Sequence, residues 1–489
     1  MTKDQLFFIN PESRLTLQEQ LRRLLIDAIL NRHFKPDKPL PSCRNLSKNL
    51  GISKNTVTLV YEHLASEGYL ISKERVGHFV NKGVLEDRIQ TKKMLPFESG
   101  ETPNWRLRYK KFPSAQKNVI RPRDWQNYQF PFIYGQVDSS LFPINEWRKC
   151  SKQAQEFRSV KEWSGDSYMR DDALLIEEIR TGLLPRRGIS VSNEEILLTL
   201  GVQYALYLIA SLFIDHSSRV GVEDPGYVDA RNIFQIHGPE LVGLPVDESG
   251  LVISERLDDC EFIYITPSHH YPTTVTMSLD RRLGLLKKAS ESDIVLIEDD
   301  YESEVNHLGK VTPAIKSLDK SDRVIYVSSL SKSLAPGLRI GYLVGPKELI
   351  REARALRNLM LRHPPTNIQR TVALFMSRGN YHAYMVRMRK IYKERWEVMN
   401  HAIAKHLRIC SFTPTAGGSS FWISGPSNLN CKELEVEAAK QSIVLETGNW
   451  FFLSESPPKN CFRLGFSSIP THRIETGVRL IGEIIRSIT

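Results

Sequence analysis

The sequence predicts two folds in one chain: a small helical domain with a β-hairpin, followed by a large α/β domain with a mostly parallel sheet. The first observation is length, because 489 residues exceed what one hydrophobic core usually spans. The second is periodicity, since apolar residues recur at helical spacing near the N-terminus, whereas β-branched runs alternate with helical stretches beyond residue 190. The third is charge, because the two parts differ in their balance of basic and acidic residues.

The formal net charge of +10 is concentrated in the N-terminal quarter of the chain. Residues 1–125 hold 23 Lys and Arg against 13 Asp and Glu, and the other 364 residues hold 43 of each sign. This asymmetry indicates a module that binds a polyanion, attached to an electrically neutral body. A basic surface that only improves solubility is the alternative.

Composition is that of a soluble globular protein, with 41% hydrophobic and 25% charged residues. The six cysteines form no Cys-x-x-Cys pair, which argues against a zinc ribbon or a disulfide framework, and we expect no metal site. No signal peptide is evident, because Asp4 and Asn10 stand where an apolar segment would be needed. We therefore expect a cytoplasmic protein that does not associate with membranes.

Three helices are expected in residues 15–67. The first spans residues 15–33, and Ser42 can cap a second helix that ends at Gly51. Ser53 can cap a third helix over residues 54–67, which Gly68 closes. Two short helices joined by a tight turn are a helix-turn-helix. The apolar positions that give the first helix its buried face are Leu17, Leu21, Leu24, Leu25, Ala28 and Ile29.

The third helix begins with small polar and basic residues, and this end of the helix enters the major groove of DNA in helix-turn-helix proteins. Residues 69–80 then predict a β-hairpin wing, whose Lys73 and Arg75 can contact the DNA backbone or minor groove. The prediction is a winged helix that binds DNA. A small helical domain that binds protein is the alternative.

Residues 15–80 resemble the GntR group of bacterial transcription regulators in the stretches Leu40-Pro-Ser-Cys-Arg-Asn-Leu46, Leu50-Gly-Ile-Ser-Lys-Asn-Thr-Val57, Glu67-Gly-Tyr-Leu70 and Val76-Gly-His-Phe-Val80. His78 stands where the family usually has Thr, which leaves its minor-groove contact open. The resemblance implies that the DNA contacts are made by Arg44, Ser53, Lys54, Asn55, Thr56, Gly77 and His78.

Periodicity disappears from Asn81 to about Arg123, a stretch that contains Pro96, Pro103, Pro113 and Pro122 and many basic residues. This stretch predicts a linker. Its basic residues either keep the linker hydrated or add nonspecific affinity for DNA. We therefore expect a DNA-binding domain over residues 1–82, a linker over 83–128, and an effector domain over 129–489.

In the body, buried strands are expected at 196–200, 219–222, 262–266, 294–297, 324–327 and 340–344, with a helix over 202–213. The turn Thr199-Leu-Gly-Val202 joins a strand to a helix N-terminus, where backbone N–H groups and the helix dipole favour a phosphate.

A lysine follows the strand that ends at Val327. Lys332 is flanked by the hydroxyls of Ser329 and Ser331 and followed by Arg339. This set offers an amine for a Schiff base and donors for a phosphate dianion, as a phosphorylated aldehyde cofactor requires. A solvated loop lysine is the alternative. Asp299 ends an earlier strand and can pair with a pyridinium nitrogen, with Tyr301 close by in the sequence.

These motifs resemble the fold-type I aminotransferases of the pyridoxal phosphate family over residues 130–489. The resemblance implies that Gly201, Val202 and Gln203 hold the cofactor phosphate, that Tyr227 stacks on the ring, and that Arg463 clamps a ligand carboxylate. In the stretch Thr266-Pro-Ser-His-His-Tyr-Pro, Tyr271 replaces the usual Asn. Tyr301 is then the expected partner of the cofactor hydroxyl, with His269 or His270 as alternatives.

A GntR-type winged helix followed by an aminotransferase-like body resembles the MocR (GabR-like) regulators over nearly the whole chain. The resemblance implies a domain-swapped homodimer that binds promoter DNA and uses pyridoxal 5′-phosphate to sense an amino acid, an amine or the cofactor itself. An active class I/II aminotransferase with an accessory DNA-binding domain is the alternative, and a residual half-reaction is compatible with either.

Overall fold

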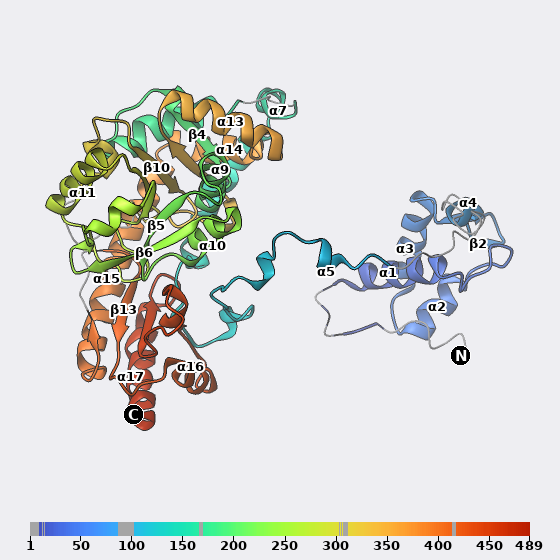
Figure 1. The fold of residues 1–489 in the computed structure, drawn as a ribbon. Helices are drawn as coiled ribbons and strands as arrows, with labels where there is room; N and C mark the ends of the chain where they lie inside the picture. The colour runs from blue at the N-terminus through green and yellow to red at the C-terminus, as the bar shows by residue number, and fades with distance from the viewer. Residues whose placement is uncertain are drawn as a thin grey trace. The chain divides into compact units, whose positions relative to one another are not determined.

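The computed structural model describes residues 9–11, 13, 15–86, 102–165, 170–302, 304, 306, 312–412 and 417–489. Part of the expected linker, residues 87–101, lies outside them. The chain forms two compact units, Met1–Tyr109 and Lys110–Thr489 (Figure 1). No helix among the described residues is both long and apolar enough to cross a membrane.

The three expected helices of the N-terminal unit are confirmed as α1 (Leu17–Leu30), α2 (Cys43–Leu50) and α3 (Lys54–Ser66). Each begins at a side-chain cap, because Thr16, Ser42 and Ser53 accept a hydrogen bond from a first-turn N–H. Helix α2 ends at Gly51, whose φ of 65° a residue without Cβ adopts without strain.

The expected wing is also confirmed, as the antiparallel strands β1 (Leu70–Lys73) and β2 (Gly77–Val80). One core unites the wing with the helices: Val57, Val60 and Leu64 of α3 pack against α1, and the first and last residues of the hairpin, Leu70 and Val80, join them. The hydroxyl of Tyr61 donates to the Pro41 carbonyl at 2.9 Å, so the segment before α2 is tied to α3. Helices α4 (Lys82–Glu86) and α5 (Trp105–Arg108) complete the unit.

The large sheet of the second unit has the order β4-β11-β10-β9-β8-β5-β6-β7 among the described residues. Strands β10, β9, β8, β5 and β6 run parallel, whereas β11 is antiparallel to both β10 and β4. The strands are β4 (Ile196–Thr199), β5 (Arg219–Asp224), β6 (Glu240–Asp247), β7 (Gly250–Leu251), β8 (Phe262–Ile265), β9 (Val295–Asp299), β10 (Val324–Ser329) and β11 (Gly341–Val344).

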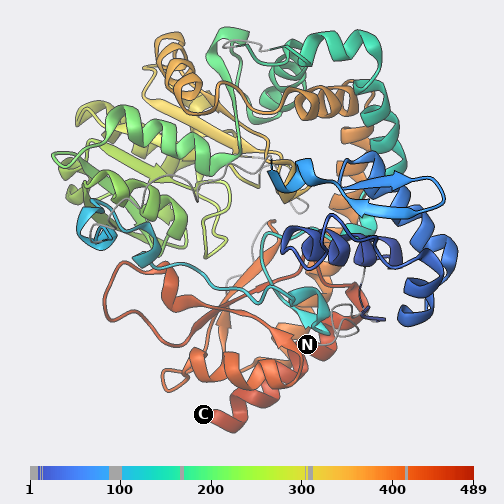
Figure 2. The ribbon, with the colours of Figure 1, turned by 90° about the vertical axis from the view of Figure 1, so that its right-hand side faces the viewer.

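Helices cover both faces of this sheet, as Figure 2 shows for the part coloured green to yellow. Leu197 and Leu343 point to one face, where α9 (Val202–Phe213), α10 (Val228–His237) and α13 (Lys347–Leu361) pack. Leu198 and Val344 point to the other face, toward α8 (Ala173–Glu178), α14 (Thr366–Ser377) and α15 (Asn380–His406). Burial on both faces explains the continuous apolar runs of the sequence. Helix α11 (Leu279–Glu291) packs on β8 and β9, near the short helix α12 (Ile315–Leu318).

A smaller antiparallel sheet at the C-terminus has the order β12-β13-β16-β15 among the described residues. Its strands are β12 (Ser411–Phe412), β13 (Ser420–Ser424), β15 (Glu446–Thr447) and β16 (Cys461–Gly465), and helices α16 (Cys431–Lys440) and α17 (Thr471–Ile488) accompany it. Strand β14 (Ile443–Val444) pairs with β3 (Phe130–Pro131), which ties the start of this unit to its end. Helices α6 (Ile144–Ala154) and α7 (Phe157–Trp163) follow β3.

The expected fold class is confirmed, including each of the six strands and the helix over 202–213. The sequence pattern does not predict strands β6 and β7, the small C-terminal sheet, or the antiparallel direction of β11 relative to its neighbours. Strand β6 contains Gly243 and Pro245, residue types that are depleted in strands, and the short buried run of β11 carries no information about strand direction.

Candidate functional site

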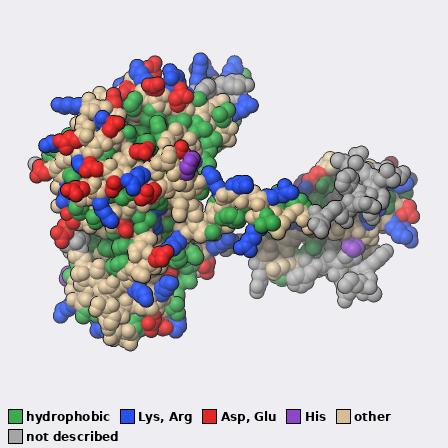
Figure 3. Space-filling view, in the orientation of Figure 1, with side chains coloured by type: hydrophobic (Ala, Val, Ile, Leu, Met, Phe, Trp, Pro, Cys, Tyr) green, Lys and Arg blue, Asp and Glu red, His purple; other side chains and the backbone are tan. Residues whose placement is uncertain are grey.

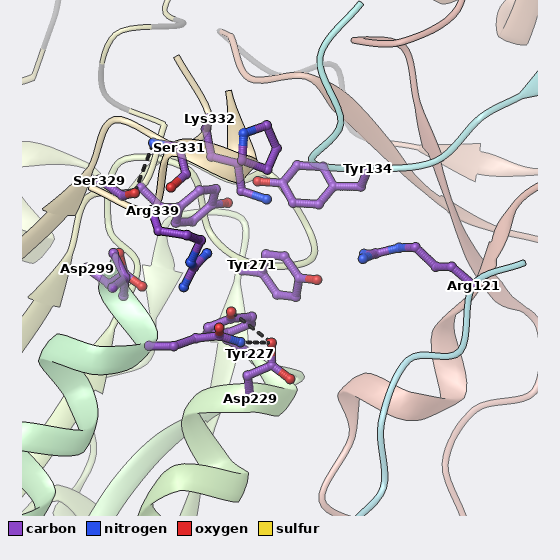
Figure 4. A pocket seen from close by; sticks show the side chains of 14 residues that line it. Arg121, Tyr134, Tyr227, Asp229, Tyr271, Asp299, Ser329, Ser331, Lys332 and Arg339 are labelled. Carbon is purple, nitrogen blue, oxygen red and sulfur yellow. Dashed lines mark hydrogen bonds between the residues drawn. The ribbon is translucent and has the colours of Figure 1, made fainter. Parts of the chain in front are cut away.

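A cavity of about 220 Å³ lies at the carboxyl ends of β9 and β10 and the N-terminus of α9 (Figure 4). Most of the residues expected to bind a cofactor meet there, although β4, β9 and β10 are far apart in the sequence. The carboxyl ends of parallel strands share one edge of a sheet, which is where ligands of α/β proteins bind. The cavity is lined by Arg121, Tyr134, Val202, Gln203, Tyr227, Asp229, Tyr271, Asp299, Tyr301, Ser329, Ser331, Lys332, Pro336 and Arg339.

One end of the cavity is built to hold an anion. Helix α9 has no side-chain cap, so the N–H groups of its first turn remain available. Gly201 precedes it with φ of +87°, and a Cβ there would lie 3.1 Å from Nη2 of Arg339. The Arg339 guanidinium donates to the Leu200 carbonyl at 2.9 Å, which holds it beside this turn. Among the described residues, the buried Oγ of Ser331 has no hydrogen-bond partner.

Lys332 reaches into the cavity from the turn after β10. Its Nζ lies 4.7 Å from the centre of the Tyr134 ring. Gly135 leaves room for this amine, because a Cβ at that position would overlap Nζ. Burial lowers the pKa of Lys332 to about 8, and the Glu302 carboxylate opposes that shift. The amine is therefore closer to its neutral, nucleophilic form at neutral pH than an exposed lysine.

Asp299 ends β9 with its carboxylate buried at the cavity wall. Its Oδ2 accepts a hydrogen bond of 2.7 Å from the Tyr264 hydroxyl, whereas Oδ1 has no partner among the described residues. Burial raises the pKa of Asp299 to about 7. A cation facing Oδ1 would restore the ionised form, as a protonated pyridine nitrogen does.

Aromatic rings form the remaining walls. The ring of Tyr227 lies 4.9 Å from that of Tyr271, and the Tyr227 hydroxyl donates to Asp229 at 2.9 Å. Tyr301 donates its hydroxyl to the His269 backbone carbonyl at 2.7 Å, so only its oxygen lone pairs remain for a ligand. His270 is buried away from the cavity, with Nδ1 at 2.6 Å from Thr273 Oγ1.

Arg463 does not line the cavity. Its Nε and Nη2 donate to Oε2 of Glu446 at 2.9 and 2.5 Å, and Nη2 also donates to the Tyr271 hydroxyl at 2.8 Å. Glu446 and Arg463 are opposite residues of β15 and β16. Glu446 therefore occupies the Nε and Nη2 edge of the guanidinium that was expected to clamp a ligand carboxylate.

Sequence reasoning missed five lining residues: Arg121, Tyr134, Asp229, Tyr271 and Pro336. In the sequence, Arg121 is one of several basic residues of the predicted linker, and nothing local distinguishes it. Tyr271 stands where the resembled aminotransferases have Asn, and this replacement is a usable signal for a pocket residue. Asp229 follows Tyr227 by two residues in the first turn of α10, a proximity that could have prompted its inclusion.

The residues expected to contact DNA all lie in the N-terminal unit, and they differ in how far they are exposed to solvent. Arg44, Lys54, Asn55, Lys73 and Arg75 are exposed, whereas Gly77 and His78 are half-buried. Ser53 and Thr56 are already engaged, because the Ser53 hydroxyl caps the Thr56 N–H at 3.0 Å and lies 2.8 Å from the Thr56 hydroxyl. Nδ1 of His78 lies 2.9 Å from the Ser72 hydroxyl, across the wing.

Charge on the second unit is mixed rather than basic. In Figure 3, acidic and basic side chains are interspersed over the face of this unit that is visible. The residues of this unit beyond position 125 hold equal numbers of basic and acidic side chains. The candidate DNA surface is therefore the winged helix, where exposed basic residues accompany the first turn of α3 and the wing.

The chain combines a winged helix with an α/β domain whose cavity contains a lysine, an aspartate and a site suited to an anion. This combination is that of transcription regulators that use a cofactor. The family of bacterial regulatory proteins of the gntR type matches residues 17–80, and aminotransferases of class I and II match residues 136–481. The chain belongs to the MocR-type regulators, in which these two domains are fused.

Similar proteins agree with this assignment. The HTH-type transcriptional regulator TauR of Rhodobacter capsulatus is 39% identical, covering 98% of this chain and 99% of the relative. The probable rhizopine catabolism regulatory protein MocR of Rhizobium meliloti is 30% identical, covering 82% and 79%. The solved structure of the α-aminoadipate aminotransferase LysN from Thermus thermophilus, complexed with N-(5′-phosphopyridoxyl)-L-leucine, has a TM-score of 0.72 at 26% identity, covering 79% of this chain and 99% of that one.

The family and fold make pyridoxal 5′-phosphate the cofactor of the large domain, as expected from the sequence. The described residues fit it on three points. The uncapped turn of α9, Arg339 and the unpartnered Ser331 hydroxyl suit its phosphate. The unpartnered Oδ1 of Asp299 suits its ring nitrogen, and the Lys332 amine suits its aldehyde.

Proposed function

We propose that this protein regulates transcription by binding promoter DNA through its winged helix and sensing a small amine, an amino acid or pyridoxal 5′-phosphate itself in the large domain. The observation that supports this most is the meeting of Lys332, Asp299 and Arg339 in one cavity of a chain that also carries a GntR-type winged helix. The division into a DNA-binding domain over 1–82, a linker over 83–128 and an effector domain over 129–489 is part of this proposal.

The residues of the cavity divide the work of holding the cofactor. When bound, the cofactor supplies an aldehyde that condenses with amines, and Lys332 provides the amine of the chain. Gly201, Val202, Gln203, Ser329, Ser331 and Arg339 orient the phosphate, while Asp299 holds a proton on the ring nitrogen. Tyr227 would stack on the cofactor ring, and the Tyr301 oxygen would accept a hydrogen bond from the hydroxyl of that ring. The Lys332 amine would hold the aldehyde end of the cofactor, and its release by an effector amine would change its contact with the Tyr134 ring.

DNA contacts are assigned to Arg44, Ser53, Lys54, Asn55 and Thr56, with Lys73, Arg75, Gly77 and His78 on the wing. The exposed Lys54 and Asn55 reach base edges or phosphates from the first turn of α3. A homodimer, domain-swapped in the arrangement that we propose, would present two such heads to the two halves of an operator.

An active aminotransferase with an accessory DNA-binding domain is the second candidate. Lys332 favours it, because its lowered pKa is what a catalytic amine needs. The pairing of Arg463 with Glu446 counts against it, since a carboxylate of the chain already occupies the fork that an amino-acid substrate would use.

The deciding experiment measures operator DNA binding by the full chain with and without pyridoxal 5′-phosphate, and then with candidate amines. We expect binding that depends on Lys54 and changes when an amine alters the absorbance of the cofactor. If the chain turns over amino acids and its DNA affinity changes with neither the cofactor nor the amine, the result would support the active aminotransferase instead.

A further inference from the structure

The segment that enters the large domain lies against the side of the cofactor cavity. The side chain of Gln116 donates to the Asn232 carbonyl at 2.8 Å, and the amide of Asn232 donates back to the Lys117 carbonyl at 2.8 Å. Val119 packs against the aromatic cluster that includes Tyr271. We call residues 116–121 the strap. These contacts hold it on the body, although sequence reasoning assigned it to a linker.

Arg121 ends the strap and enters the cavity from the side opposite Lys332 and Arg339 (Figure 4). Its side chain is 32% exposed, so a molecule in the cavity can reach it. Its Nε donates to Oε1 of Glu446 at 2.5 Å. Among the described residues, its two terminal nitrogens donate to no protein acceptor.

Glu446 is shared by two arginines. Its side chain is 2% exposed, and Arg463, which is 1% exposed, occupies its Oε2 with two hydrogen bonds. Arg121 takes Oε1. One carboxylate compensates two guanidinium groups only in part, so this cluster of three side chains keeps one positive charge. Arg463 is buried, binds Glu446 through Nε and Nη2, and does not line the cavity, whereas Arg121 lines the cavity with its terminal nitrogens unpaired among the described residues.

We propose that Arg121 binds the anionic group of the effector, so that the strap is part of the effector site. The inference rests on the proposed function and narrows its ligand class: a primary amine that also carries a carboxylate. The amine lies at the Lys332 end of the cavity, and the carboxylate lies at the Arg121 end. The terminal nitrogens of a guanidinium match the two oxygens of a carboxylate, which makes this pairing selective as well as strong.

The position of Arg121 in the chain gives this contact a regulatory consequence. In the chain, the strap follows the segment that begins at the end of the winged helix. A ligand carboxylate and Glu446 both use Arg121, and occupancy of the cavity therefore changes how firmly the strap is held on the body. Coupling of this kind requires that the ligand bind the two arrangements of the strap unequally.

The test uses the full chain loaded with pyridoxal 5′-phosphate and follows the cofactor spectrum during titration. The probes are glycine, β-alanine and 4-aminobutanoate, each paired with the uncharged amine of similar length: ethylamine, propylamine and butylamine. We expect at least one acid to bind about tenfold or more tighter than its uncharged partner. Arg121→Ala should abolish that preference while leaving the uncharged amines unaffected, and Arg121→Lys should retain part of it.

Lys117→Ala is the matched control, because it removes one positive charge from the same strap at an exposed side chain. It should keep the full preference for the acid. Unaltered binding of the uncharged amines shows that the cavity of Arg121→Ala is intact. A preference that survives in Arg121→Ala, or no preference for any acid in the unmodified chain, would overturn the inference. Failure of the proposed function looks different, as the absence of cofactor absorbance before any amine is added.

Discussion

Gly135 and Lys332 are fitted to each other: a Cβ at position 135 would overlap the Nζ of Lys332. Two segments nearly two hundred residues apart thus meet at the reactive amine. Gly135 has φ of +76°, a conformation that glycine adopts without the strain that other residues suffer. The glycine therefore serves both the backbone turn and the position of the lysine.

Gly135→Ala should reduce covalent attachment of the cofactor at Lys332 by displacing the amine. Gly379→Ala is the control, because Gly379 has φ of +75° but an added Cβ there meets nothing within 4 Å. Both variants should lose about 1 kcal/mol of folding stability from backbone strain. Only the first should lose cofactor absorbance. Equal absorbance in the two variants would mean that the collision is relieved by movement of Lys332.

Lys332→Ala should lose covalent attachment altogether, because no other described lysine lines the cavity. The measurement is borohydride reduction followed by peptide mass spectrometry, which finds the phosphopyridoxyl group on the Lys332 peptide of the unmodified chain. Lys287→Ala, at a side chain that is 79% exposed, should behave like the unmodified chain. A phosphopyridoxyl group on any other lysine would contradict the assignment.

Asp299→Asn should flatten the pH dependence of stability in the cofactor-free protein. Burial raises the pKa of Asp299 to about 7, whereas an unfolded aspartate titrates near pH 4. Between these values the folded chain retains a proton that the unfolded chain loses, so the free energy of unfolding falls as pH rises. Between pH 4 and 7, the free energy of unfolding should therefore fall by about 1–3 kcal/mol less in the variant than in the unmodified chain.

Urea unfolding at several pH values measures this difference, and Asp280→Asn, at an exposed position, should leave the slope unchanged. The same Asp299→Asn variant should bind pyridoxal 5′-phosphate more weakly, since the neutral amide no longer stabilises a protonated ring nitrogen. Cofactor affinity equal to that of the unmodified chain would remove Asp299 from its proposed role.

Arg463→Ala should destabilise the fold by about 1.5–3 kcal/mol, because the buried Glu446 loses its two hydrogen bonds from Arg463 and keeps only the one from Arg121. Burial alone would raise the pKa of Glu446, and Arg463 together with Arg121 holds this pKa below its ordinary value. Adding Glu446→Gln to Arg463→Ala should recover part of the loss. Thermal unfolding of the single and double variants checks this, and an unchanged stability in Arg463→Ala would show that Arg121 alone is a sufficient partner for Glu446.

Lys54→Ala should weaken operator binding at all sequences tested and reduce the slope of log affinity against log salt by about 1, the value for one phosphate contact. Arg22→Ala is the control, since the Arg22 guanidinium is already paired with Glu67 at 2.7 Å. Its salt slope should match that of the unmodified chain. Binding of operator DNA that does not depend on salt would contradict a winged-helix contact with phosphates.

Local patterns in the sequence were enough for the winged helix. Caps at Ser42 and Ser53, a glycine at 51 and the apolar spacing of α1 and α3 are short-range signals, and each helix formed within a few residues of its expected bounds. The order of motifs also indicated the class of the body, because Gly201, Asp299, Lys332 and Arg339 lie at or just after the ends of strands that meet at one edge of a mostly parallel sheet.

The tertiary structure alone decided which charges face the cavity. No sequence pattern pairs Glu446 with Arg463, since their contact depends on the register of β15 and β16. Nor does any local signal separate Arg121 from the other basic residues of its segment, because its place in the cavity follows from docking of the strap on Asn232 and the aromatic cluster. Sequence determines local conformation through short-range sterics and hydrogen bonds, whereas the pairing of distant side chains is set by packing of the whole domain.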